Sequence, residues 1–131
     1  MKAKCIALYN EITEERQGKS AWLTIGKEYV VLSIQCSSNS VGKKNYYFIM
    51  DDTGTWGSLQ NAKQFEVVSH NIPRSWKVYS KAELDFLEFT PTSWSKEGFW
   101  EHYYDAEPEA LAIFTKEVEA MYEEEGLKFV E

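Results

Sequence analysis

The stretch that decides the fold is residues 29–59, YVVLSIQCSSNSVGKKNYYFIMDDTGTWGSL. Its first part, Tyr29–Cys36, is rich in β-branched residues. Val30, Leu32 and Ile34 alternate there with more polar positions, as expected for a strand with one buried face. This segment therefore predicts a β-strand at the start of a β-rich region.

The rest of this stretch predicts a β-hairpin. We expect a polar, glycine-containing loop at Ser37–Asn45, an apolar strand at Tyr46–Met50 and a returning strand at Thr55–Leu59. Asp51–Gly54 between them has the residues that a tight turn needs, because Asp bonds to its own backbone and Gly adopts positive φ. Further short strands are expected at Cys5–Tyr9, Trp22–Ile25 and Phe65–Val68.

These strands are joined by segments too short for a crossover helix, so the sheet should be antiparallel. A small curved barrel would bury such short strands and limit their exposed edges. Ile72-Pro73 is expected to close the β region. The predicted fold class is therefore α+β, with a small antiparallel β-barrel followed by two or three C-terminal helices.

The helices are predicted from caps and periodicity. Ser80–Glu83 matches the capping box S-x-x-E, although the following residues could also be extended, and Pro91 would end a helix there. A second short helix could be capped by Ser93 or Ser95. The last helix should begin near Pro108 and end before Gly126. Its apolar stripe consists of Leu111, Phe114, Val118, Met121 and Tyr122.

A chain of 131 residues fits one domain, with a β part over about 1–72 and a helical part over about 80–126. The apolar stretch near the N-terminus is too short for a signal-peptide core, and no apolar run is long enough to span a membrane. We therefore expect a cytoplasmic protein. Cys5 and Cys36 lack metal-ligand spacing and lie in apolar runs, so we expect buried free thiols.

Charge is divided along the chain. Residues 1–79 contain ten Lys/Arg and seven Asp/Glu, a net charge of +3, whereas residues 80–131 contain four Lys and fourteen Asp/Glu, a net charge of −10. The acidic half is also rich in aromatic residues. This balance argues against nucleic acid and anionic membranes as partners and favours docking onto a basic protein surface. A solvated helical face is the alternative interpretation.

Catalytic and metal-binding patterns are weak. His70 and His102 are the only histidines, and neither has neighbours spaced as zinc ligands or as a nucleophile–base pair. No glycine-rich phosphate loop is present in the sequence. We therefore expect no enzyme activity, no cofactor and no bound metal. Asp52 is the one serious candidate for activating a nucleophile.

Asp52-Thr53-Gly54 is also the triplet that marks aspartic proteases. The bulky Trp56 soon after it differs from that pattern. So does the acidic helix near the C-terminus, where such a protease needs a second strand ending in glycine. The hairpin turn is therefore the favoured interpretation.

The segment Leu23–Val68 resembles an SH3-like barrel, through LTIGKEYVVLSI, YYFIMDDTGTWGSL and FEVV. The whole layout, with SWSKEGFWEHYYDAEPEALAIF and an acidic helix after the barrel, resembles small acidic immunity proteins of bacterial toxin systems. The resemblance implies a cytoplasmic, non-catalytic protein that neutralises a cognate toxin domain by tight binding.

The expected binding surface lies in the acidic half. Its predicted anchors are Trp94, Trp100 and Tyr104, and its predicted carboxylates are Glu97, Glu101 and Asp105. Phe99 and Tyr103 are expected to be core residues. The alternative is an SH3-like adaptor or regulatory module that binds a peptide or protein through barrel aromatics such as Tyr46 and Trp56.

Overall fold

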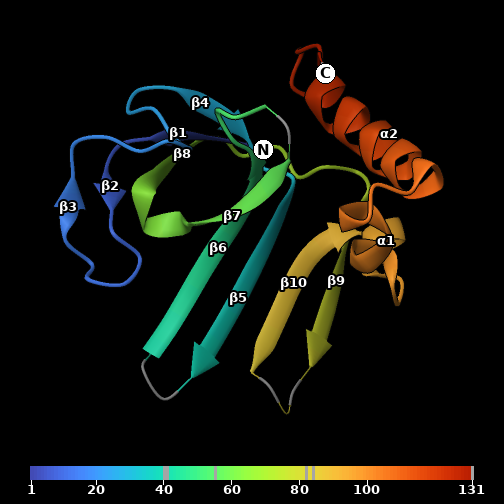
Figure 1. The fold of residues 1–131 in the computed structure, drawn as a ribbon, viewed down its shortest axis with the longest axis horizontal. Helices are drawn as coiled ribbons and strands as arrows, with labels where there is room; N and C mark the ends of the chain where they lie inside the picture. Colours follow the sequence, from blue (N-terminus) through green and yellow to red (C-terminus); the bar gives the residue numbers. More distant parts are fainter. Residues whose placement is uncertain (40–41, 55, 82, 84, 131) are drawn as a thin grey trace.

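The computed structural model describes residues 1–39, 42–54, 56–81, 83 and 85–130. Strands occupy most of the first two thirds of the chain, and helices follow (Figure 1). The strands are β1 (Lys2–Cys5), β2 (Leu8–Tyr9), β3 (Arg16–Gln17), β4 (Glu28–Val30), β5 (Ser33–Asn39), β6 (Gly42–Met50), β7 (Gly57–Asn61), β8 (Phe65–Ser69), β9 (Trp76–Lys81) and β10 (Phe86–Pro91). The helices are the 3₁₀ turns η1 (Ala62–Gln64) and η3 (Thr92–Ser95) and the α-helices α1 (Phe99–Tyr104) and α2 (Pro108–Glu124).

Within the described residues the strands form one larger sheet, in the order β7-β6-β5-β10-β9, and a smaller one, in the order β4-β1-β8. The short strands β2 and β3 pair separately. All strand pairs are antiparallel. The α+β class with antiparallel sheets and two C-terminal α-helices is thus confirmed. The described sheets do not close into a barrel, so the SH3-like closure stays a prediction.

The hairpin of β5 and β6 is longer than the sequence predicted. A loop was expected at Ser37–Asn45, but pairing continues from Ser33↔Phe48 outward to Asn39↔Gly42. Cross-strand backbone pairing therefore overrides the polar, glycine-containing composition of this segment. Trp22–Ile25, in contrast, was predicted as a strand and lies in turns and irregular structure.

The β region also extends further along the chain than predicted. Ile72-Pro73 does not close it. Of the two alternatives left open after the capping box at Ser80, the structure shows the extended one, because β9 and β10 form a hairpin there. β10 then pairs with β5, which brings the hairpin into the larger sheet (Figure 1). The helical part therefore begins only at η3, and the predicted boundary near residue 80 is corrected accordingly. Residues 82 and 84 lie outside the described residues.

The last helix agrees with its prediction. α2 begins at Pro108 and ends at Glu124, and Gly126 follows with a φ of 72°, as expected for a glycine after a helix end. The second short helix begins later than expected: Gly98, not Ser93 or Ser95, is the N-cap of α1. The apolar stripe of α2 faces the core, where Phe114, Val118 and Met121 are buried.

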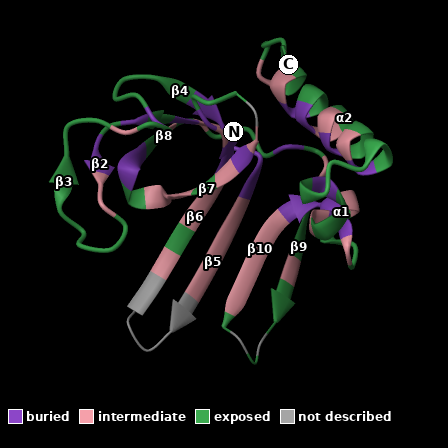
Figure 2. Cartoon of the chain, viewed as in Figure 1, coloured by how far each residue is buried: buried purple, intermediate pink, exposed green. Residues whose placement is uncertain are grey.

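Two clusters of buried side chains lie on opposite faces of the larger sheet. Phe48 belongs to the cluster formed with α1, α2 and η3, and its neighbour Ile49 belongs to the cluster formed with β1, β4 and β8. Adjacent residues of a strand point to opposite faces, so β6 contributes to both cores. Figure 2 shows the buried residues gathered at one end of β5, β6 and β10, and the described residues farther along these strands are intermediate or exposed.

A tight contact at the start of β7 leads to a prediction about stability. A Cβ added at Gly57 would overlap the ring of Phe48, which is buried and packs against Trp94, Trp100 and Phe114. We expect Gly57→Ala to lower the free energy of unfolding by about 1–3 kcal/mol. Urea unfolding measures this loss.

The matched control for this substitution is Gly18→Ala. An added Cβ at Gly18 meets nothing within 4 Å, so this variant should unfold close to the wild-type midpoint. Equal stability of the Gly57→Ala and Gly18→Ala variants would contradict the packing of Phe48 described above.

Candidate functional site

A groove of about 430 Å³ lies between the larger sheet and the elements η3 and α1. Its walls come from parts of the chain far apart in sequence. We call it the sheet–helix groove and define it by Gln35 of β5, Tyr79 of β9, Glu88 of β10, Trp94 of η3, and Trp100 and Glu101 of α1.

The strand register explains why the polar side chains of the sheet meet there. Glu88 lies opposite Gln35 on one side and opposite Tyr79 on the other, and directly paired residues of antiparallel strands share a face. Gln35 Nε2 donates a hydrogen bond of 3.0 Å to Glu88 Oε2. On the same face the register places Phe48 closer to the helices, where Trp100 packs on it with ring centroids 5.2 Å apart. The helices thus cover the end of this face that contains Phe48, and Glu88 lies nearer to the uncovered end.

Glu88 is a partly buried carboxylate of the groove. This burial raises the pKa of Glu88, while the hydrogen bond from Gln35 and the positive charge of Lys81 offset part of the effect. Within the described part of the chain Glu88 makes no ion pair. A partly buried carboxylate without a paired cation favours a positively charged neighbour.

The structure corrects the prediction that Trp94 is an exposed anchor. Trp94 is 1% exposed and stacks on Phe114 with ring centroids 5.0 Å apart. Large aromatic rings are buried when helices close over a sheet. η3 places Trp94 in the core cluster that also contains Phe114 of α2. Its role in a binding surface is therefore limited to the wall of the groove.

Trp100 and Tyr104 are accessible, as the sequence predicted. Tyr104 is 55% exposed, and Trp100 is partly buried. Their rings lie 6.0 Å apart, and the ring of Trp56 lies 5.9 Å from that of Tyr104. Phe99 and Tyr103, predicted as core residues, are 7% and 1% exposed, so those two predictions are confirmed.

The three predicted carboxylates lie in or beside α1. Glu97, Glu101 and Asp105 are all exposed and recur every four residues. Residues four apart lie on one face of a helix, so Glu101 and Asp105 form an acidic row that continues toward Glu97 before the helix begins. We call Trp100, Tyr104, Glu97, Glu101 and Asp105 the acidic–aromatic surface.

The two histidines lie apart from this arrangement. His102 is on α1, and its Nδ1 shares a hydrogen bond with Glu107, which raises the pKa of His102. His70 is exposed after β8. Neither lies beside a nucleophile in any hydrogen bond of the described residues.

Asp52, the catalytic candidate, links two segments of the chain. Its carboxylate accepts hydrogen bonds from Thr24 Oγ1 at 2.7 Å, Lys27 Nζ at 2.7 Å and Tyr29 OH at 2.9 Å. The turn prediction for Asp51–Gly54 is confirmed, because the segment connects β6 to β7 and Gly54 has a φ of 70°. Asp52 thus ties this turn to the segment before β4.

We expect Asp52→Ala to lower the free energy of unfolding by about 1–3 kcal/mol at neutral pH, because three donors lose their acceptor. Burial alone would raise the pKa of Asp52, but the hydrogen bonds from Lys27, Thr24 and Tyr29 outweigh it and lower that pKa. The unfolded chain therefore binds more protons at acidic pH, and the stability from Asp52 is lost as the pH falls below about 4. Thermal unfolding across pH measures both effects.

The control is Glu66→Ala, which removes an exposed carboxylate of β8. It should change stability little at any pH. If the difference between wild type and Asp52→Ala were the same at pH 3 as at pH 7, the assigned role of the ionised carboxylate would be wrong.

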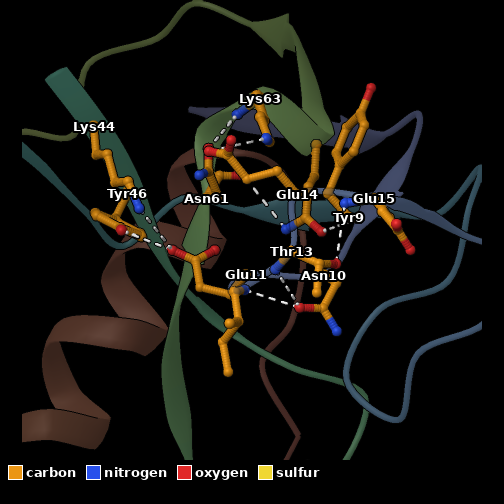
Figure 3. A network of polar contacts seen from close by, with 12 residues as sticks. Tyr9, Asn10, Glu11, Thr13, Glu14, Glu15, Lys44, Tyr46, Asn61 and Lys63 are labelled. Carbon is orange, nitrogen blue, oxygen red and sulfur yellow. Dashed lines mark hydrogen bonds and ion pairs between the residues drawn. The ribbon is translucent and has the colours of Figure 1, made fainter. Parts of the chain in front are cut away.

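The two aromatics of the adaptor alternative do not share a surface contact. Trp56 packs against Tyr103 with ring centroids 5.0 Å apart. Tyr46 instead donates a hydrogen bond of 2.8 Å to Glu11, and Figure 3 shows this contact within a polar network around the segment between β2 and β3. In this network Lys63 also lies 4.0 Å from Glu14.

Ligand groups for a metal do not gather in the part of the chain described here, where no cluster of three or more His, Cys, Asp or Glu side chains is found. Cys5 is buried, Cys36 is partly buried, and both are free thiols. Among the described residues, no helix combines the length and apolarity needed to cross a membrane. The sequence matches no protein family model, no curated protein and no solved structure.

Proposed function

We propose that this chain is a non-catalytic binding protein that neutralises a cognate bacterial toxin domain by docking on a basic surface of that domain. The observation that carries the proposal is the acidic–aromatic surface: Glu97, Glu101 and Asp105 expose their carboxylates beside the accessible rings of Trp100 and Tyr104. Aromatic anchors provide contact area, and carboxylates steer a basic partner into place.

The packing of Trp100 supports the proposal. Trp100 packs against Phe48, Trp94 and Tyr103, with ring centroids 5.2–5.6 Å apart. A side chain that is already held loses little conformational freedom when a partner covers it, so more of the contact energy becomes affinity. The net charge of −10 over residues 80–131 disfavours an anionic partner.

Binding rather than catalysis is proposed because Asp52, the catalytic candidate, has its carboxylate engaged by Thr24, Lys27 and Tyr29. If Asp52 also served catalysis, Asp52→Asn would remove an activity. The proposal expects every functional readout of a folded Asp52→Asn protein to match that of the wild type.

The test is co-expression with the product of the open reading frame immediately upstream. We expect that product to stop growth when expressed alone, and we expect growth to recover when this protein is present, with the two chains purifying as a stable complex. A toxic product that this protein neither binds nor neutralises would contradict the proposal. So would an upstream product without toxicity.

A further inference from the structure

The sheet–helix groove contains a carboxylate that can accept more hydrogen bonds than the described chain donates to it. Glu88 is a partly buried carboxylate that receives one hydrogen bond, from Gln35, and has no ion pair. Trp94 lines the same groove, is 1% exposed, and its indole nitrogen has no hydrogen-bond acceptor among the described residues. A carboxylate accepts several hydrogen bonds, so Glu88 can bind a ligand in the groove, whereas the indole nitrogen of Trp94 has less than 1 Å² of exposed surface.

The carboxylate of Glu88 favours a ligand that is a cation and that donates hydrogen bonds. A basic side chain of a polypeptide offers both. The groove volume of about 430 Å³ is within the usual range for small ligand pockets.

Arginine fits the walls better than lysine. The rings of Phe86 and Trp100 line the groove together with Glu88 and Glu101. A planar guanidinium stacks on aromatic rings, is weakly hydrated and reaches carboxylates through several donors at once.

Two lysines also line the groove, and they do not reverse this preference. Lys81 and Lys96 are exposed, and neither forms an ion pair with Glu88 in the described residues. Their flexible side chains can turn toward solvent, whereas Glu88 is partly buried and hydrogen-bonded by Gln35. A bound anion would therefore lie close to the carboxylate of Glu88.

We infer that the sheet–helix groove binds an arginine residue of the partner protein, with Glu88 accepting hydrogen bonds from the guanidinium and the ring of Trp100 stacking on it. The inference rests on the proposed function, because it specifies the contact that the basic partner makes beside the acidic–aromatic surface. Glu88 is one of the groove residues that the sequence analysis did not select.

The experiment uses the full chain and the peptide acetyl-Gly-Arg-Gly-amide, followed by ¹H–¹⁵N spectra of the tryptophan indoles. We expect the signal of Trp100 to shift as the peptide is added. Trp76 is an internal control, because its Nε1 already donates to the Leu32 carbonyl at 2.9 Å, and its signal should stay in place. Glu88→Gln should weaken peptide binding about tenfold or more.

Three controls make the result specific. Acetyl-Gly-Gln-Gly-amide should leave the indole signals unchanged, and so should inorganic phosphate. The variant Glu66→Gln, which loses an exposed carboxylate of β8, should bind the arginine peptide as the wild type does. Glu88→Gln should also keep its other signals and its unfolding temperature, since burial already disfavours the charged form of Glu88.

The inference is overturned if the arginine peptide leaves the Trp100 signal in place, if the glutamine peptide shifts it equally, if phosphate shifts it instead, or if Glu88→Gln binds normally. The proposed function fails separately. A neutralising complex without any peptide effect would leave the docking proposal standing and remove only the arginine groove, whereas peptide binding without neutralisation would do the opposite.

Discussion

Replacing Trp94 with alanine is expected to lower the free energy of unfolding by about 3–5 kcal/mol, the largest stability loss that we predict for this protein. Trp94 is 1% exposed, and its ring touches those of Phe48, Trp100 and Phe114. Alanine would leave a cavity that these three rings cannot fill by collapsing inward. Urea unfolding followed by circular dichroism measures the loss.

The control for Trp94→Ala is Tyr104→Ala, which truncates an aromatic ring of α1 that is 55% exposed. We expect this variant to lose less than about 1 kcal/mol of stability. Similar losses in both variants would show that Trp94 is not the centre of the core between α2 and the larger sheet. A clear difference would also mean that Trp94→Ala cannot serve as a probe of binding, since it strongly destabilises the fold.

Reversing two charges of the acidic–aromatic surface should have the largest effect on binding. We expect Glu97→Lys with Glu101→Lys to slow association with the neutralised toxin domain by about tenfold or more at low salt. The physical reason is electrostatic steering, which depends on exposed charges and is screened as salt rises. Stopped-flow association at several salt concentrations measures the rate. Folding should be unchanged, because both side chains are exposed.

The control double variant is Glu15→Lys with Glu66→Lys. It changes the net charge by the same amount, at exposed positions before β3 and on β8. We expect a much smaller decrease in its association rate. Equal decreases in the two double variants would mean that overall charge, not the surface on α1, steers the partner, and an unchanged rate in both would remove steering altogether.

Local patterns in the sequence were sufficient for some elements. The spacing of Phe114, Val118 and Met121 predicted α2, since an amphipathic helix is specified by its own periodicity. The turn at Asp51–Gly54 was predicted for a similar reason, because its conformation depends on adjacent residues.

The β9–β10 hairpin was missed because its stability comes from pairing that no local pattern reveals. The capping box at Ser80 favoured a helix, whereas in the structure β10 pairs with β5, far away in sequence. A signal was present: residues 87–91 alternate in polarity, with Glu88 and Thr90 between apolar neighbours.

The candidate site was predicted only in part, because some of its residues depend on local structure and others on tertiary packing. Glu97, Glu101 and Tyr104 could be selected because exposure of charged and aromatic residues on a short helix depends mainly on that helix. Glu88 and Gln35 could not be selected, because only the strand register brings them together and only α1 turns their neighbourhood into a groove. Trp94 was misplaced because burial by packing helices is a tertiary property.

Amide hydrogen exchange of the complex with the toxin domain tests the central claim most directly. If the acidic–aromatic surface is the docking site, residues 97–105 should exchange more slowly in the complex than in the free protein, while β2 and β3 keep the same exchange rates. Protection confined to the region of Tyr46 and the segment between β2 and β3, with no change in α1, would contradict the account and favour the adaptor alternative.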